Sequence, residues 1–136
     1  MPSAAKTSIS PMLSVRRGIE AIEFYKAAFG ALEISSIGDE QRGVVAHMSV
    51  GGAEFWLADE APAYLNFSPE SLSPEFRTGA TVRMVLVAED PDAMFERAIK
   101  AGAKAVWPVE DKDYGWRVGR LVDPFGHHWE IGKPLG

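Results

Sequence analysis

Residues 123–131, DPFGHHWEI, combine the residue types of a tight turn with those of a strand. A leading aspartate, a proline in the second position and a glycine in the fourth are typical of a β-turn over residues 123–126. The five residues that follow, 127–131, predict the last strand of the chain. Because strand side chains alternate between two faces, His128 and Glu130 share one face of this strand.

Turn and capping residues divide the rest of the chain into short strands and two helices. A Gly-Gly pair at 51–52 separates two strand-like runs and predicts a two-residue hairpin. Apolar residues recur at helical spacing over 19–29, and Asp90 followed by Pro91 caps and begins a second helix. The predicted strands are residues 9–15, 31–37, 44–50, 53–58, 81–87, 103–109, 114–122 and 127–131, and the predicted helices are 19–29 and 91–101.

The order of these elements occurs twice along the chain. Each half has the order strand, helix, strand, strand, strand, and a Gly-Ala pair follows each helix, at 30–31 and at 102–103. We therefore predict an α+β fold in one domain, residues 1–136, built from two βαβββ modules at about 8–59 and 80–133. A connector occupies 60–79. The alternative is an ordinary α+β domain in which the repeat is a coincidence.

The composition is that of an acidic globular chain without cysteine. Of its 136 residues, 46% are hydrophobic and 24% are charged, which suits one domain with its own core. The lack of cysteine excludes disulfides and thiolate metal sites. A net charge of −5 argues against a nucleic-acid partner, and no apolar run reaches the roughly 20 residues of a membrane span. Residues 1–6 lead into no signal-peptide core, so we expect a cytoplasmic protein without a membrane partner.

Three stretches resemble the vicinal oxygen chelate superfamily, the glyoxalase, bleomycin-resistance and extradiol-dioxygenase group. They are residues 22–31 (IEFYKAAFGA), 89–93 (EDPDA) and the turn and strand at 123–131. The resemblance spans about residues 8–133 and is closest to the glyoxalase-like branch found beside phosphonate-metabolism genes. It implies two modules that form paired half-barrels around a shared cavity. It also implies a homodimer, which the open sheet edges favour.

The resemblance also implies where a metal would be held. In metal-dependent members, four ligands come from the first and fourth strands of each module, which here places Ser10, Trp56, Arg83 and Glu130 at these positions. Only Glu130 is a competent ligand, and the guanidinium of Arg83 repels a cation. We therefore expect no cofactor. If a divalent metal is bound after all, the sequence offers another set, Glu130 with His128, His47 or Glu54.

The remaining cavity positions suggest an organic ligand. Arg83 and Glu130 either form a salt bridge in place of the metal, or Arg83 receives a ligand carboxylate or phosphonate. Trp56, Ser10 and His128 are expected to bind the ligand in the cavity. Tyr114 and Trp116 are expected near its mouth, where aromatic rings bind flat organic groups. The two remaining tryptophans, 107 and 129, are expected in the core or at an interface.

Two functions follow from these residues. The first is a metal-free protein that binds a small organic molecule in the cavity. The alternative is a divergent glyoxalase-like enzyme, a lyase or isomerase, in which Glu130 is a general base and Arg83 stabilises an oxyanion, or in which a metal occupies the second ligand set. Whether the protein is an enzyme stays open at this point.

Overall fold

The computed structural model describes residues 7–60, 74 and 82–136, and it contains the same arrangement of elements twice. The first module consists of β1 (Met12–Val15), α1 (Gly18–Phe29), β2 (Leu32–Asp39), β3 (Gly43–Val50) and β4 (Ala53–Asp59). The second consists of β5 (Arg83–Val87), α3 (Pro91–Ala101), β6 (Lys104–Asp111), β7 (Trp116–Val122) and β8 (His128–Pro134). The predicted α+β fold with two βαβββ modules is confirmed.

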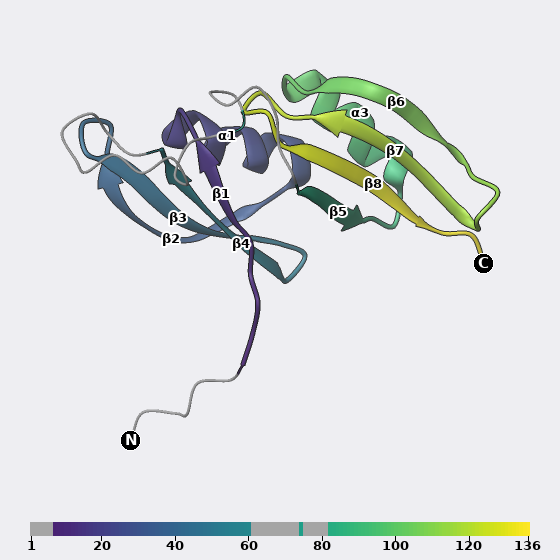
Figure 1. Ribbon diagram of the computed structural model, residues 1–136, viewed down its shortest axis with the longest axis horizontal. Helices are drawn as coiled ribbons and strands as arrows, with labels where there is room; N and C mark the ends of the chain where they lie inside the picture. Colours follow the sequence, from purple (N-terminus) through teal and green to yellow (C-terminus); the bar gives the residue numbers. More distant parts are fainter. Residues whose placement is uncertain (1–6, 61–73, 75–81) are drawn as a thin grey trace.

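Each module has a four-stranded mixed sheet with one helix against it (Figure 1). The strand orders are β1-β4-β3-β2 and β5-β8-β7-β6, so the first strand of each module pairs in parallel with its fourth. The hairpin at Gly51 and Gly52 is present, and both residues have positive φ, at 57° and 90°. Glycine tolerates this backbone conformation, which a two-residue hairpin loop requires.

The modules meet first through their helices. α1 packs against α3, and Arg97 of α3 donates from Nε to the carbonyl oxygen of Ala27 at 2.6 Å. An aromatic cluster continues the contact into the core. Its members are rings from both modules, namely Phe24, Tyr25, Phe29, Phe55, Phe125 and Trp129.

The Asp123 carboxylate is the polar centre of this core. It is buried and accepts hydrogen bonds from the Tyr25 hydroxyl, the Trp129 indole and the backbone N–H groups of Phe125 and His127. The His127 ring lies 2.8 Å from the carbonyl oxygen of Ser14, so it ties β8 to β1. The turn predicted at 123–126 therefore also holds the two modules together.

Several predicted element ends differ from the structure. The first strand begins at Met12 rather than at residue 9, and residues 7–10 are exposed. The seventh strand begins at Trp116, which leaves Tyr114 in a turn, and the last strand extends to Pro134. Most of the predicted connector at 60–79 lies outside the described residues. No helix of the described part of the chain is long and apolar enough to cross a membrane.

Candidate functional site

The two faces of each sheet have different surroundings. α1 lies against β3 and β4, and α3 lies against β6, β7 and β8. Alternate side chains, such as Phe55 and Leu57 on β4 or Trp129 and Ile131 on β8, are buried beneath these helices. The side chains between them, including Trp56 and Glu130, point to the opposite face. Helices α1 and α3 do not cover this side, and we call it the open face of each sheet.

The open face of the second sheet has a cluster of charged groups around Glu130. Glu130 Oε2 lies 2.7 Å from Arg83 Nε and 3.0 Å from Arg120 Nη2. Sheet register explains the contacts, because Arg120 is paired directly with Glu130 across β7 and β8, and β5 runs beside β8. The Glu130 and Arg120 side chains are only 16% and 24% exposed, whereas Arg83 is 59% exposed.

Polar atoms of this cluster remain without partners. Both guanidinium groups approach the same oxygen of Glu130, and Arg120 uses only Nη2. Arg120 Nε and His128 Nδ1 are buried and find no hydrogen-bond partner among the residues that the structure describes. A buried polar atom without a partner lowers the stability of the folded protein. These atoms therefore indicate that the surface can form further hydrogen bonds.

Trp107 on the neighbouring strand β6 and Lys112, which follows that strand, add an aromatic ring and a further cation. Trp107 is half-buried, with the Arg120 guanidinium 5.5 Å and the Lys112 ammonium 4.5 Å from its ring centroid. Both distances are typical of cation–π contacts. Neither Arg120 nor Lys112 is among the site residues predicted from the sequence, and Trp107 was expected in the core or at an interface. The turn at 123–126 is the signal that brings the strands on either side of it together, and the observed register, in which Val122 pairs with His128, sets Arg120 opposite Glu130.

The open face of the first sheet has a different group. The His47 ring stacks on Trp56 with centroids 4.1 Å apart and an interplanar angle of 2°. His47 Nε2 also lies 2.7 Å from Glu54 Oε1, although the geometry is not that of a hydrogen bond. An aromatic surface beside a carboxylate suits flat organic molecules.

The structure thus places the predicted site residues in separate groups. Trp56, His47 and Glu54 lie together on the first sheet, and Arg83, His128 and Glu130 on the second. Ser10 is exposed and precedes β1, Tyr114 is 63% exposed in the β6–β7 turn, and Trp116 is half-buried at the start of β7.

The residues at the implied metal positions do not fit a divalent cation. Serine, tryptophan and arginine occupy three of them, and the Arg83 guanidinium is held against the one carboxylate. Within the described ranges, no three histidine, aspartate or glutamate side chains gather as a metal site would require, so the second ligand set is not assembled within one chain there.

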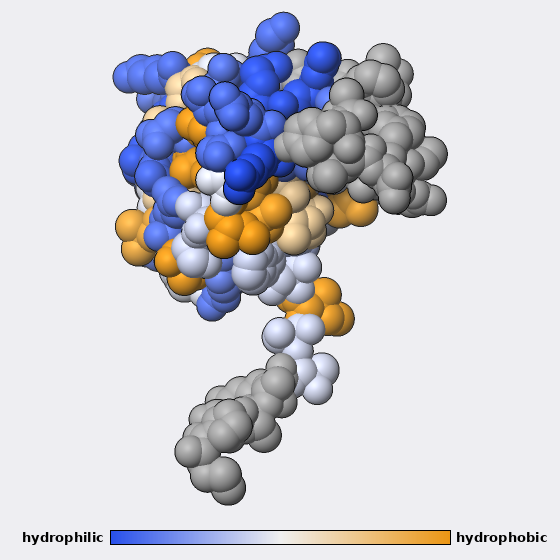
Figure 2. Space-filling model, turned by 90° about the vertical axis from the view of Figure 1, so that its left-hand side faces the viewer, coloured by the Kyte–Doolittle hydropathy of each residue, from blue (hydrophilic) through white to orange (hydrophobic). Residues whose placement is uncertain are grey.

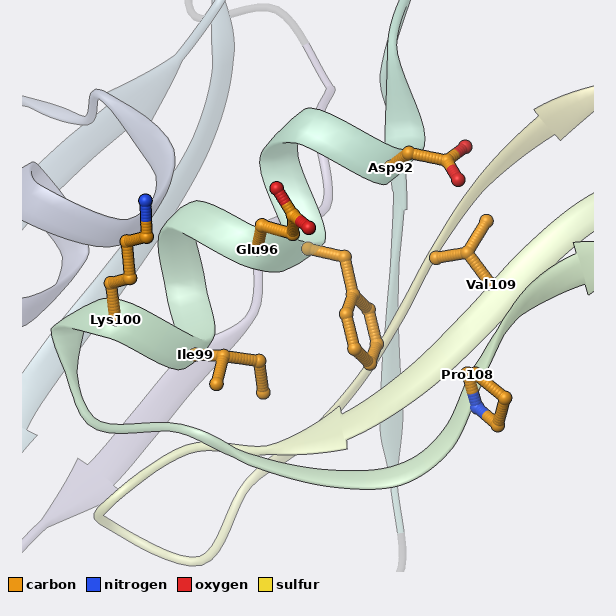
Figure 3. A pocket seen from close by; sticks show the side chains of 7 residues that line it. Asp92, Glu96, Ile99, Lys100, Pro108 and Val109 are labelled. Carbon is orange, nitrogen blue, oxygen red and sulfur yellow. The ribbon is translucent and has the colours of Figure 1, made fainter.

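Two of the grooves lined by described residues lie beside the second sheet. One, of about 720 Å³, lies between the modules, where the β3–β4 hairpin faces β5 and α3, and Val85 and Val87 line it. The other, of about 540 Å³, lies between α3 and β6 (Figure 3). Asp92 at its rim is already bound by both Nε and Nη2 of Arg117, at 2.8 and 2.7 Å. The first groove is the better ligand site, because it is largely apolar and adjoins the open face of the second sheet.

Paired βαβββ modules with open sheet faces define a class of small α+β proteins, and sequence comparison identifies the family. Residues 10–131 match the glyoxalase/bleomycin resistance protein/dioxygenase superfamily. The chain belongs to this superfamily. An uncharacterised protein of Mycobacterium bovis is 36% identical over 129 residues, which is 94% of this chain and 84% of that protein.

Solved structures show the same fold. A gene product of Arabidopsis thaliana superposes with a TM-score of 0.72 at 27% identity, covering 95% of this chain and all of that chain. The fosfomycin resistance protein FosX of Listeria monocytogenes superposes with a TM-score of 0.69 at 15% identity, covering 97% and 96% of the two chains. At that identity the similarity concerns the fold alone.

Proposed function

We propose that this protein binds a small organic molecule on the open faces of its sheets, without the metal site usual in its family. The observation that carries the proposal is the pairing of Glu130 with both Arg83 and Arg120, at 2.7 and 3.0 Å. These guanidinium groups form ion pairs with the carboxylate that a metal would need as a ligand. The aromatic surface of Trp56 and His47 and the groove beside β5 supply apolar contact for a ligand.

Metal content is the measurement that tests the metal-free part of this proposal. The full chain is incubated with Ni²⁺, Zn²⁺, Mn²⁺ or Fe²⁺, desalted and analysed by elemental mass spectrometry, beside the Glu130→Ala variant. We expect far less than one metal per chain, with no dependence on Glu130. About one metal per chain that is lost in Glu130→Ala would contradict the proposal and favour the alternative, a glyoxalase-like metal-dependent lyase or isomerase.

We also propose that the protein is a cytoplasmic homodimer. Exposed apolar side chains on a strand at a sheet edge support a dimer, namely Leu32, Ile34 and Ile37 on β2. Figure 2 looks onto the end formed by the first module, where hydrophobic residues interrupt a mainly hydrophilic surface. Sedimentation analysis is expected to give twice the mass of one chain, and the mass of one chain would contradict the dimer.

A further inference from the structure

We propose that Arg83 and Arg120 form an oxyanion-binding site, so that the ligand is a small organic acid with a carboxylate or phosphonate group and an apolar body. This inference rests on the proposed function and names the chemical class of its ligand. In the free protein, Glu130 takes the place of the ligand's oxyanion between the two guanidinium groups.

The charge of the cluster around Glu130 favours an anionic ligand. The cluster on the second open face contains three cations, Arg83, Arg120 and Lys112, and the carboxylates paired with them are Glu130 and Glu110. The cluster is therefore positive in a chain whose net charge is −5. A locally positive cluster on an otherwise acidic protein marks the place where an anion would be held.

Arg120 has a hydrogen-bond donor that Glu130 does not use. Nε and Nη2 of arginine point along one edge of the guanidinium and together match the two oxygens of a carboxylate. Arg120 gives Nη2 to Glu130, whereas its Nε is buried without a partner in the described structure. Glu130 therefore satisfies this edge with one oxygen only. A ligand oxyanion that reaches both donors would form the stronger, bidentate contact.

The two arginines differ in burial, and this difference gives them different roles in binding an anion. Arg120 is largely withdrawn from solvent, whereas most of Arg83 is exposed at the edge strand β5. Charge-assisted hydrogen bonds are stronger where water is excluded, so Arg120 would provide most of the affinity. Arg83, with its exposed guanidinium, is suited to meet an arriving anion and to draw Glu130 aside.

The apolar body of the ligand has a defined place beside this cluster. Val85 pairs in register with Glu130, is 65% exposed and also lines the groove between the modules. Val87 lines the same groove. An acid whose oxyanion lies on the arginines can therefore extend its apolar part along β5, which favours an organic acid over an inorganic ion.

Three probes that share a phenyl ring test the inference. Isotope-labelled full-length protein is titrated with benzoate, phenylphosphonate and neutral benzamide, and the backbone and arginine Nε–H signals are followed by NMR. The Arg120 Nε–H signal is assigned by its loss in Arg120→Gln. We expect at least one of the two anions to shift this signal and to bind at least about tenfold more tightly than benzamide. Which anion binds more tightly distinguishes a carboxylate from a phosphonate ligand.

Variants test whether the arginines around Glu130 cause the preference for an anion over benzamide. Arg120→Gln should abolish the preference for the anion, Arg83→Gln should reduce it, and Lys100→Gln, which removes an equal charge on α3, should retain it. Glu130→Gln should tighten anion binding several-fold, because the competing carboxylate is gone. An unchanged backbone spectrum in each variant shows that the fold is intact.

The outcomes separate the two proposals. Equal binding of benzamide and both anions, or an anion preference that survives Arg120→Gln, would overturn the oxyanion site and leave small-molecule binding standing. Weaker anion binding by Glu130→Gln would also overturn it. If none of the three probes perturbs either open face, the oxyanion site and the proposed binding function fail together.

Discussion

The Tyr25 hydroxyl donates a hydrogen bond of 2.6 Å to Asp123 Oδ2, although 98 residues separate the two in sequence. The bond joins the helix of the first module to the turn of the second. It therefore connects the two stretches of sequence that resemble the superfamily most clearly. Both partners are buried, and the carboxylate also holds the Trp129 indole, so we regard this bond as the principal polar contact between the modules.

Replacing Tyr25 by phenylalanine should destabilise the protein. The change leaves Asp123 with one fewer donor in a buried place, which costs about 1–3 kcal/mol of unfolding free energy. Urea denaturation of the two proteins measures the difference. Tyr114→Phe is the matched control, because this hydroxyl lies on an exposed turn, and its effect should stay within about 0.5 kcal/mol. Equal effects of the two variants would contradict the role given to the Tyr25–Asp123 bond.

The same contact predicts a loss of stability at alkaline pH. Burial, followed by the charge and hydrogen bond of Asp123, raises the pKa of Tyr25 well above its usual value of 10.0. The folded state therefore keeps a proton that the unfolded state releases, so the stabilisation is complete below about pH 10 and decreases above it. We expect the unfolding free energy to decrease less steeply above about pH 10 in Tyr25→Phe than in the unaltered protein. Identical slopes would show that Tyr25 does not contribute.

The two arginines around Glu130 should contribute unequally to stability. Arg120→Gln removes a largely buried partner of a carboxylate that is itself only 16% exposed, and we expect a loss of about 1–3 kcal/mol. Arg83→Gln removes an exposed partner of the same carboxylate, so the expected loss is below about 1 kcal/mol. Thermal or urea unfolding compares the two variants. A larger effect of Arg83→Gln would contradict the assignment of Arg120 as the inner partner.

An exposed ion pair gives a test of the second module that does not depend on ligand binding. The hydrogen bonds from Arg117 hold the pKa of Asp92 below its usual value. In Arg117→Gln, this pKa should rise toward the usual range, which NMR titration of the side-chain carboxyl measures directly. Because the pair is exposed, the change in unfolding free energy should be small. An unchanged Asp92 pKa would show that Arg117 is elsewhere in solution.

Local signals in the sequence were sufficient for the elements of the fold. The hairpin at residues 51–52, the cap at Asp90 and the turn at 123–126 each depend on a few adjacent residues, and the structure contains all three. Trp129 was expected in the core or at an interface, and the structure buries it in the core. Element ends were less certain because tertiary contacts determine them. For example, Asp59 on β4 binds the backbone N–H of Gly18 and so holds the first turn of α1.

The two modules, their order of strands and helices, and the alternation that puts Glu130 on an open face are all predictable from local sequence patterns. The side chains that meet on this face are known only from the folded structure. Arg120 reaches Glu130 through the β7–β8 register, and Tyr25 reaches Asp123 through packing between the modules. Turns and helices form from interactions over a few residues, whereas contacts between distant residues depend on how complete elements pack. For this reason the charged cluster, unlike the fold, could not be predicted in full.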